Sequence, residues 1–101
     1  MTVTLVIDAK GLKDKKIFNK HLKKEGFSSI EDENFAYEGV AHTHLFNTRA
    51  YIIDVILTGL NKSGFDDCTM MFQIGENPME AYRYDKDNGT FIAYNIDINN
   101  I

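Results

Sequence analysis

The chain has 101 residues, of which 44 % are hydrophobic and 12 % aromatic, and its formal net charge is −4. This length predicts one domain over residues 1–101, with enough apolar residues to form a core. Its single cysteine, Cys68, excludes an internal disulfide, and the apolar neighbours indicate a small buried side chain rather than a reactive thiol. No stretch approaches the ~18 apolar residues of a membrane span, and the start shows no secretory leader. We therefore expect a cytoplasmic protein that has no membrane partner.

The charge is distributed unevenly along the chain. Residues 1–26 carry seven lysines against three acidic residues, a sum of +4, whereas residues 27–101 carry four basic against twelve acidic residues, a sum of −8. A uniformly acidic protein would be a poor ligand for nucleic acid. A local basic face keeps that class of partner open.

The first predicted strand spans residues 2–8, which are rich in β-branched side chains and nearly alternate in polarity. Residues 9–13 contain a glycine and break the strand. Asp14 is placed to cap a helix that ends at Gly26. The lysines of this helix are expected to point to solvent. Its predicted buried face comprises Ile17, Phe18, His21 and Leu22.

The pattern of the remaining chain predicts one more helix and several strands. Residues 28–34 are typical of a polar connection, and residues 35–46 return to a period of two, which predicts a strand. Thr48 is expected to cap a second helix that stops at Gly64. Further strands are predicted over residues 68–74, 80–84 and 90–96, with a hairpin turn at residues 87–89. This order predicts an α+β fold of the ferredoxin-like split β-α-β kind. It is a sandwich with two helices on one face of an antiparallel sheet and an extra C-terminal hairpin.

Asp8 is the first candidate functional residue, because it is predicted at the carboxyl end of the first strand, just before a glycine-containing turn. Rigid strands often position ligand and catalytic groups on the loops that follow them. A carboxylate here could hold a divalent metal such as Mg²⁺ or orient a water molecule. The alternative is a carboxylate that caps a backbone amide of the turn.

The second candidate is the run of seven lysines between residues 10 and 24. Ammonium groups along a helix can contact successive phosphates and release condensed counterions. The alternative is a solvated helix face without a ligand. The predicted RNA contacts are Lys13, Lys15, Lys16 and Lys20.

His42 and His44 lie two residues apart in the predicted second strand. Both side chains would then project from one face, about 7 Å apart. Such a pair can bind a metal, or serve as proton donor and acceptor in ribonuclease chemistry. It can equally be two histidines on a half-exposed sheet face. The candidate catalytic residues are Asp8, His42 and His44.

Short phrases in the first forty residues resemble two known families. The strand ending at Asp8, the close of the lysine helix over residues 22–27 and the segment over residues 35–39 resemble the small CRISPR-associated endonucleases. Residues 26–30, followed by a strand running into the second helix, resemble the GhoS-type antitoxin endoribonucleases of type V toxin–antitoxin systems. The resemblance implies a ferredoxin-like homodimer whose sheets meet, with RNA or DNA as substrate. It also implies a metal held by Asp8 of each protomer at the dimer interface.

Two functional hypotheses follow. The leading one is a dimeric endoribonuclease that acts as an antitoxin by cleaving a toxin message. The alternative is a non-catalytic protein-binding module, such as an antitoxin, an immunity protein or a phage-encoded inhibitor. That module would cover a toxin or another basic protein with its acidic C-terminal sheet, and the charge of −8 on residues 27–101 motivates it.

Overall fold

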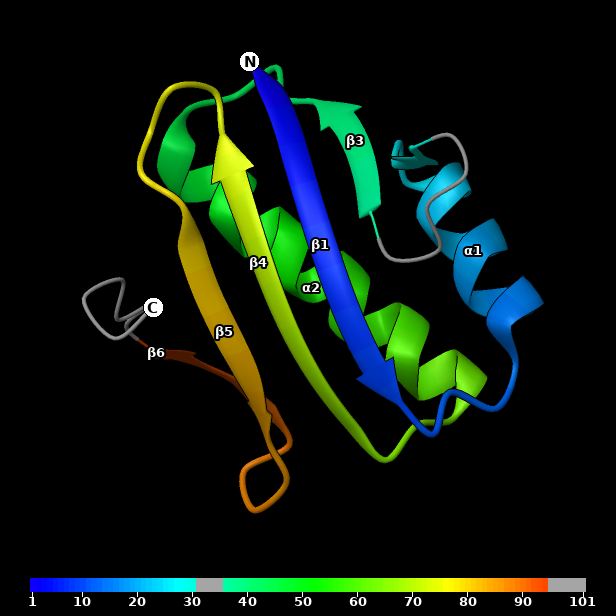
Figure 1. Cartoon of the computed structure of the whole chain (residues 1–101). Helices are drawn as coiled ribbons and strands as arrows, with labels where there is room; N and C mark the ends of the chain where they lie inside the picture. The colour runs from blue at the N-terminus through cyan, green and yellow to red at the C-terminus, as the bar shows by residue number, and fades with distance from the viewer. Residues whose placement is uncertain (31–35, 95–101) are drawn as a thin grey trace.

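The computed structural model describes residues 1–30 and 36–94 and shows a six-stranded sheet with two helices. The elements are β1 (Thr2–Lys10), α1 (Lys15–Lys24), β2 (Ser28–Ser29), β3 (Ala36–Val40), α2 (Leu45–Ser63), β4 (Asp67–Ile74), β5 (Glu80–Asp85) and β6 (Thr90–Tyr94). All neighbouring strands are antiparallel, and their order is β2-β3-β1-β4-β5-β6. Both helices lie on the same side of the sheet (Figure 1). The predicted α+β class with helices packed on an antiparallel sheet is confirmed.

The core lies between the sheet and the two helices. Strand β1 runs through the middle of the sheet, and its alternate residues Val3, Leu5 and Ile7 are at most 3 % exposed, so they face the helices. The helices supply the other half of the core with Phe18, Leu22, Ile52, Ile56 and Leu60. Burying each such side chain stabilises the folded state by about 1.5–3 kcal/mol. The apolar residues that recur every second position in strands and about every 3.6 positions in helices therefore determine which faces of the sheet and helices pack together. Neither described helix combines the length and the apolar composition needed to cross a membrane.

Helix α1 begins as predicted. The Asp14 carboxylate accepts a hydrogen bond from the Ile17 backbone N–H at 3.0 Å, which satisfies one of the free amides of the first turn. Phe18, His21 and Leu22 are buried, as expected. The prediction for Ile17 is wrong, because this side chain is 44 % exposed. It lies about 100° around the helix from Phe18 and so turns away from the sheet.

The segment after β3 departs from the prediction. Strand β3 ends at Val40 rather than residue 46, and α2 starts at Leu45 with His44 as its N-cap. Thr48 is therefore not the cap. It is buried in the first turn, where its hydroxyl donates to the His44 carbonyl at 3.1 Å. Leu45, Thr48 and Ile52 follow the helical spacing i, i+3, i+7, and this burial outweighs the local alternation that resembled a strand.

The other strands agree with the prediction to within a residue or so at the ends that the structure describes. Strand β4 starts at Asp67 and β5 ends at Asp85, and the hairpin turn places Gly89 at φ +64°. Residues 95 and 96 of the last predicted strand lie outside the described residues. The predicted polar connection contains a short strand, β2, paired with β3.

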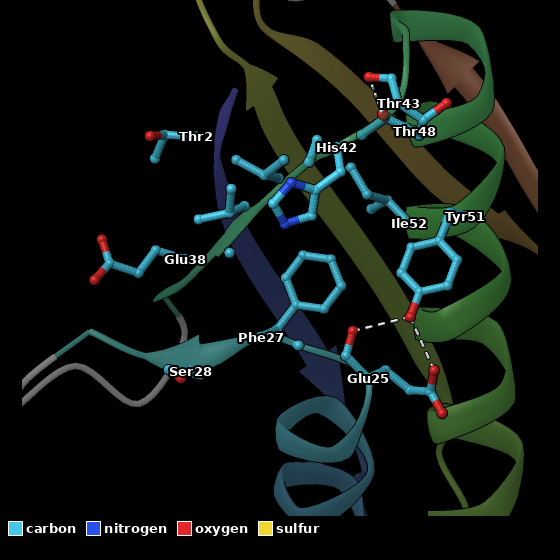
Figure 2. Close-up of a pocket in the computed structure, with 15 residues that line it drawn as sticks. Thr2, Glu25, Phe27, Ser28, Glu38, His42, Thr43, Thr48, Tyr51 and Ile52 are labelled. Atoms are coloured by element: carbon cyan, nitrogen blue, oxygen red, sulfur yellow. Dashed lines mark hydrogen bonds between the residues drawn. The ribbon is translucent and has the colours of Figure 1, made fainter.

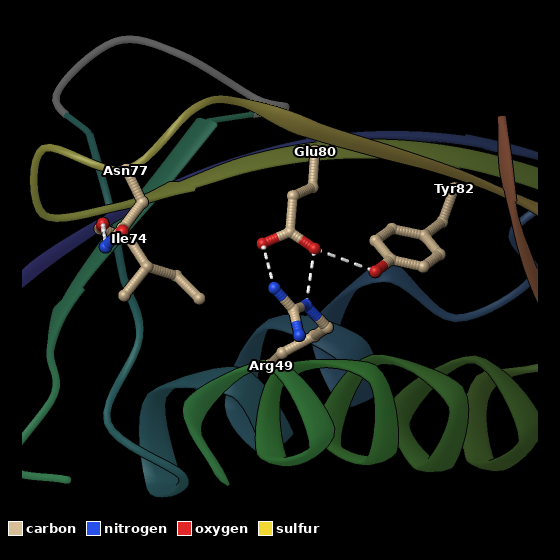
Figure 3. Close-up of polar contacts among 5 residues, drawn as sticks. All are labelled: Arg49, Ile74, Asn77, Glu80 and Tyr82. Atoms are coloured by element: carbon tan, nitrogen blue, oxygen red, sulfur yellow. Dashed lines mark hydrogen bonds and ion pairs between the residues drawn. The ribbon is translucent and has the colours of Figure 1, made fainter. Parts of the chain in front are cut away.

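A polar network joins α2 to β5 within the core layer (Figure 3). Arg49 forms a bidentate ion pair with Glu80, with Nη2 donating to Oε2 at 3.1 Å, and the Tyr82 hydroxyl donates to Glu80 Oε1 at 2.8 Å. Burial, reinforced by the bond to Glu80, raises the pKa of Tyr82 to about 12. The network fixes the amino-terminal half of α2 against the sheet.

Candidate functional site

Asp8 lies inside β1 and not at its end. The ladder between β1 and β4 continues through Ala9 and Lys10, and Asp8 pairs with Thr69. The prediction that the strand stops at Asp8 is therefore wrong, because two further residues complete the ladder. The Asp8 side chain is exposed, whereas its neighbour Ile7 faces the helices. Asp8 thus points from the sheet face opposite the helices.

His42 and His44 are not on a strand. His42 lies in the connection after β3, and His44 is the N-cap of α2, where its Nε2 is 3.3 Å from Asn47 Nδ2. The expected same-face geometry of a strand pair is therefore wrong. The reason is that the chain leaves the sheet at Val40, whose partner in β1 is Thr2.

The structure separates the three candidate catalytic residues. Val40, just before the histidines, pairs with Thr2, whereas Asp8 is six residues farther along β1, about 20 Å at the usual strand rise. Within residues 1–30 and 36–94, no group of three or more His, Cys, Asp or Glu side chains is arranged to hold a metal ion. One chain does not bring Asp8 together with His42 and His44.

A cavity of about 890 Å³ lies where the end of α1, strand β3 and the amino-terminal half of α2 meet. Figure 2 shows the rings of Phe27, His42 and Tyr51 around it, with Glu25 beneath Tyr51. The volume is in the range of small-molecule sites, roughly 300–1,000 Å³. None of the candidate residues from the sequence except His42 lines this cavity.

Hydrogen bonds and close packing hold the rings of Phe27 and Tyr51 in place. The Tyr51 hydroxyl is 2.9 Å from both the Glu25 carbonyl and Glu25 Oε2, and these contacts tie α2 to the end of α1. Burial, followed by the bond to Glu25, raises the pKa of Tyr51. The Tyr51 and Phe27 rings are nearly parallel, at 23°, with centroids 6.4 Å apart. A Cβ at Gly39 would lie 2.9 Å from the Gly26 carbonyl oxygen, so glycine is needed for β3 to approach the Phe27 segment.

The second feature comprises Lys13, which precedes α1, and the five lysines of α1. We call it the lysine surface: Lys13, Lys15, Lys16, Lys20, Lys23 and Lys24. All six are exposed, and the prediction that the lysines of the helix face solvent is confirmed. Among the residues that the structure describes, the single ion pair joins Arg49 to Glu80, and no lysine of α1 takes part in one. Lys16, Lys20 and Lys24 repeat every four residues, about 6 Å apart along the helix axis.

Comparisons of this chain with protein-family models, with curated proteins and with solved structures found no match. The resemblance to the two nuclease families thus rests on the short sequence phrases and stays a prediction.

Proposed function

We propose that this chain is a small RNA-binding protein that holds single-stranded RNA along helix α1. The lysine surface is the observation that carries the proposal. Its ammonium groups are exposed and outside the ion pair of the described structure, so they are available to replace the counterions of a phosphate backbone. Lys16, Lys20 and Lys24 recur about 6 Å apart along the helix axis, so their ammonium groups can contact successive phosphates of one strand.

We also propose that the fold is of the ferredoxin-like split β-α-β kind. The order β2-β3-β1-β4, with α1 and α2 covering one face, is compatible with the ferredoxin-like split β-α-β arrangement, and β5 and β6 extend it beyond β4. On this view a homodimer forms through the sheets. The protein is cytoplasmic, where an RNA ligand is available.

Cleavage of the bound RNA, as an antitoxin endoribonuclease, is a narrower hypothesis. Asp8 points from the sheet face opposite α1, and His42 and His44 lie beyond the other end of β1. RNA held on the lysine surface is therefore separated by the sheet from Asp8 of the same chain. Catalysis by Asp8, with Mg²⁺ or with an oriented water, would act on RNA held by a second protomer.

Binding is tested by fluorescence anisotropy with a labelled single-stranded RNA of about ten nucleotides. We expect the double variant Lys16→Glu/Lys20→Glu to lose at least tenfold in affinity, because it reverses two charges of the lysine surface. The matched control, Arg83→Glu/Lys86→Glu, makes the same change in net charge on exposed residues of β5 and its turn. Equal losses of RNA affinity in the two variants would show a non-specific charge effect and would contradict RNA binding along α1. Cleavage is followed with the same RNA and Mg²⁺, comparing the parent protein with Asp8→Ala.

A specific observation also favours the protein-binding alternative. Asp66 and Asp67 lie at the start of β4, beside the β5–β6 hairpin that carries Asp85 and Asp87. This acidic end of the sheet is suited to a basic partner protein. A stoichiometric complex with a basic protein that is lost in Asp67→Asn/Asp85→Asn, but kept in Lys16→Glu/Lys20→Glu, would support this alternative.

A further inference from the structure

We infer that the cavity between α1, β3 and α2 accepts an unpaired base of the RNA strand held by the lysine surface. This inference rests on the proposed RNA binding and adds a second contact to it. The rings of Phe27, His42 and Tyr51 line the cavity, and those of His42 and Tyr51 are exposed to it. Its volume of about 890 Å³ is sufficient for a nucleobase with its ribose. Stacking on aromatic side chains is the common means of holding an unpaired base.

The stacking surface is formed before any ligand arrives. Tyr51 is 45 % exposed, yet its hydroxyl is held by two contacts of 2.9 Å to Glu25. Phe27 is only 5 % exposed and is locked against β3, with its ring at 23° to the Tyr51 ring. A base that stacks here orders few additional side chains, so little conformational entropy is lost on binding.

The charges at the cavity favour a base over a phosphate. Among the described lining residues the Glu25 carboxylate lies beside Tyr51, and none is a lysine or an arginine. An anionic group inside would face the like charge of Glu25, whereas a neutral base offers amino and imino donors to this carboxylate. The phosphates are then expected outside the cavity, on the lysine surface.

The two surfaces are continuous along the chain. The last turn of α1 carries Lys23 and Lys24, and the next residues, Glu25 to Phe27, already line the cavity. Figure 2 shows α1 ending directly below Glu25 and Phe27. A strand that follows Lys16, Lys20 and Lys24 therefore arrives at the cavity, where one base can turn inward.

The test replaces the exposed ring. Tyr51→Ala is expected to weaken binding of single-stranded RNA by roughly five- to a hundredfold, the usual effect of removing one base-stacking aromatic ring. Tyr51→Phe keeps the ring and loses only the bonds to Glu25, so a smaller loss is expected. The matched control is Phe46→Ala, on the same helix, because Phe46 is 70 % exposed and lies outside the cavity lining. Equal affinity of Tyr51→Ala and Phe46→Ala would overturn the inference.

Two further measurements separate this inference from the proposed function. The salt dependence of RNA binding should be the same for Tyr51→Ala and the parent protein, because the phosphate contacts remain. Adenosine and cytidine, which lack a phosphate, should shift the NMR signals of the His42 and Tyr51 rings in the parent protein and in Lys16→Glu/Lys20→Glu alike. If RNA binds but neither nucleoside shifts these signals, the base site fails and RNA binding by α1 stands. If the nucleosides bind but RNA does not, the base site stands and the lysine surface fails.

Discussion

The network around Glu80 gives a prediction whose size follows from the structure. Three hydrogen bonds converge on this carboxylate, two from Arg49 and one from Tyr82, and the Arg49 and Glu80 side chains are 33 % and 20 % exposed. Exposed ion pairs contribute about 0.2–1 kcal/mol, whereas breaking a fully buried pair costs about 3–5 kcal/mol. The intermediate burial leads us to expect a loss of about 2 kcal/mol in Glu80→Gln, which keeps one acceptor oxygen but no charge. For a domain of this size that loss lowers Tm by roughly 8–16 °C.

The assay is urea unfolding followed by circular dichroism, with Glu80→Gln, Arg49→Met and the double variant forming a thermodynamic cycle. Arg49→Met retains much of the apolar stem that packs on the sheet. The coupling energy of the pair should be about 1–2 kcal/mol. Glu76→Gln, an exposed residue that loses the same charge, should change the free energy of unfolding by less than about 0.5 kcal/mol. A coupling energy near zero would refute the idea that this pair fixes α2 on β5.

Three further predictions concern the charged surface and two buried groups. In Lys16→Gln/Lys20→Gln the slope of log affinity against log salt should be smaller in magnitude by about 1.4. The ratio of the parent's RNA affinity to that of the variant should therefore fall about sevenfold between 50 and 200 mM salt. An unchanged slope would show that the phosphates do not contact these two lysines. For Tyr82 the folded state holds the phenolic proton more tightly than the unfolded chain. Its contribution to stability is therefore present below pH 10.0 and is lost as the pH rises to about 12. Between these pH values the free energy of unfolding should fall more steeply with pH in the parent protein than in Tyr82→Phe, as measured by alkaline unfolding. Cys68 is 1 % exposed, and burial raises its pKa to about 12. Thiol reagents should therefore label it only after unfolding. Rapid labelling of the native protein would contradict this burial.

The parts of the fold that follow from short-range chemistry could be predicted from the sequence. The alternation of β1 and the cap at Asp14 depend on contacts within a few residues, and both were found where expected. Residues 41–46 could not be assigned correctly, because a run of six residues is compatible with either period. The burial of Thr48 and Ile52 against the sheet decides in favour of the helix, and that contact is not local.

The cavity was beyond sequence analysis for the same reason. Phe27 and Tyr51 are 24 positions apart, and they meet only because α1 and α2 lie side by side on one face of the sheet. No spacing rule links two single aromatic residues on different elements. A weak signal was present in Gly39, since a glycine inside a strand often marks a close approach of another backbone.

The position of the sheet between Asp8 and α1 gives the cleavage hypothesis a specific form. Because Asp8 and the lysine surface are on opposite faces, an active dimer would have to combine Asp8 of one protomer with RNA held by the other. Mixing inactive Asp8→Ala with inactive Lys16→Glu/Lys20→Glu should then partly restore cleavage, since the mixed dimer contains one intact Asp8 and one intact lysine surface in the required pairing. The control mixes Asp8→Ala with the double variant Asp8→Ala/Phe46→Ala, which supplies no Asp8. The opposite result is that the parent protein cleaves RNA but the first mixture does not regain cleavage. Asp8 and the lysine surface would then act within one chain, and their separation by the sheet would not limit catalysis.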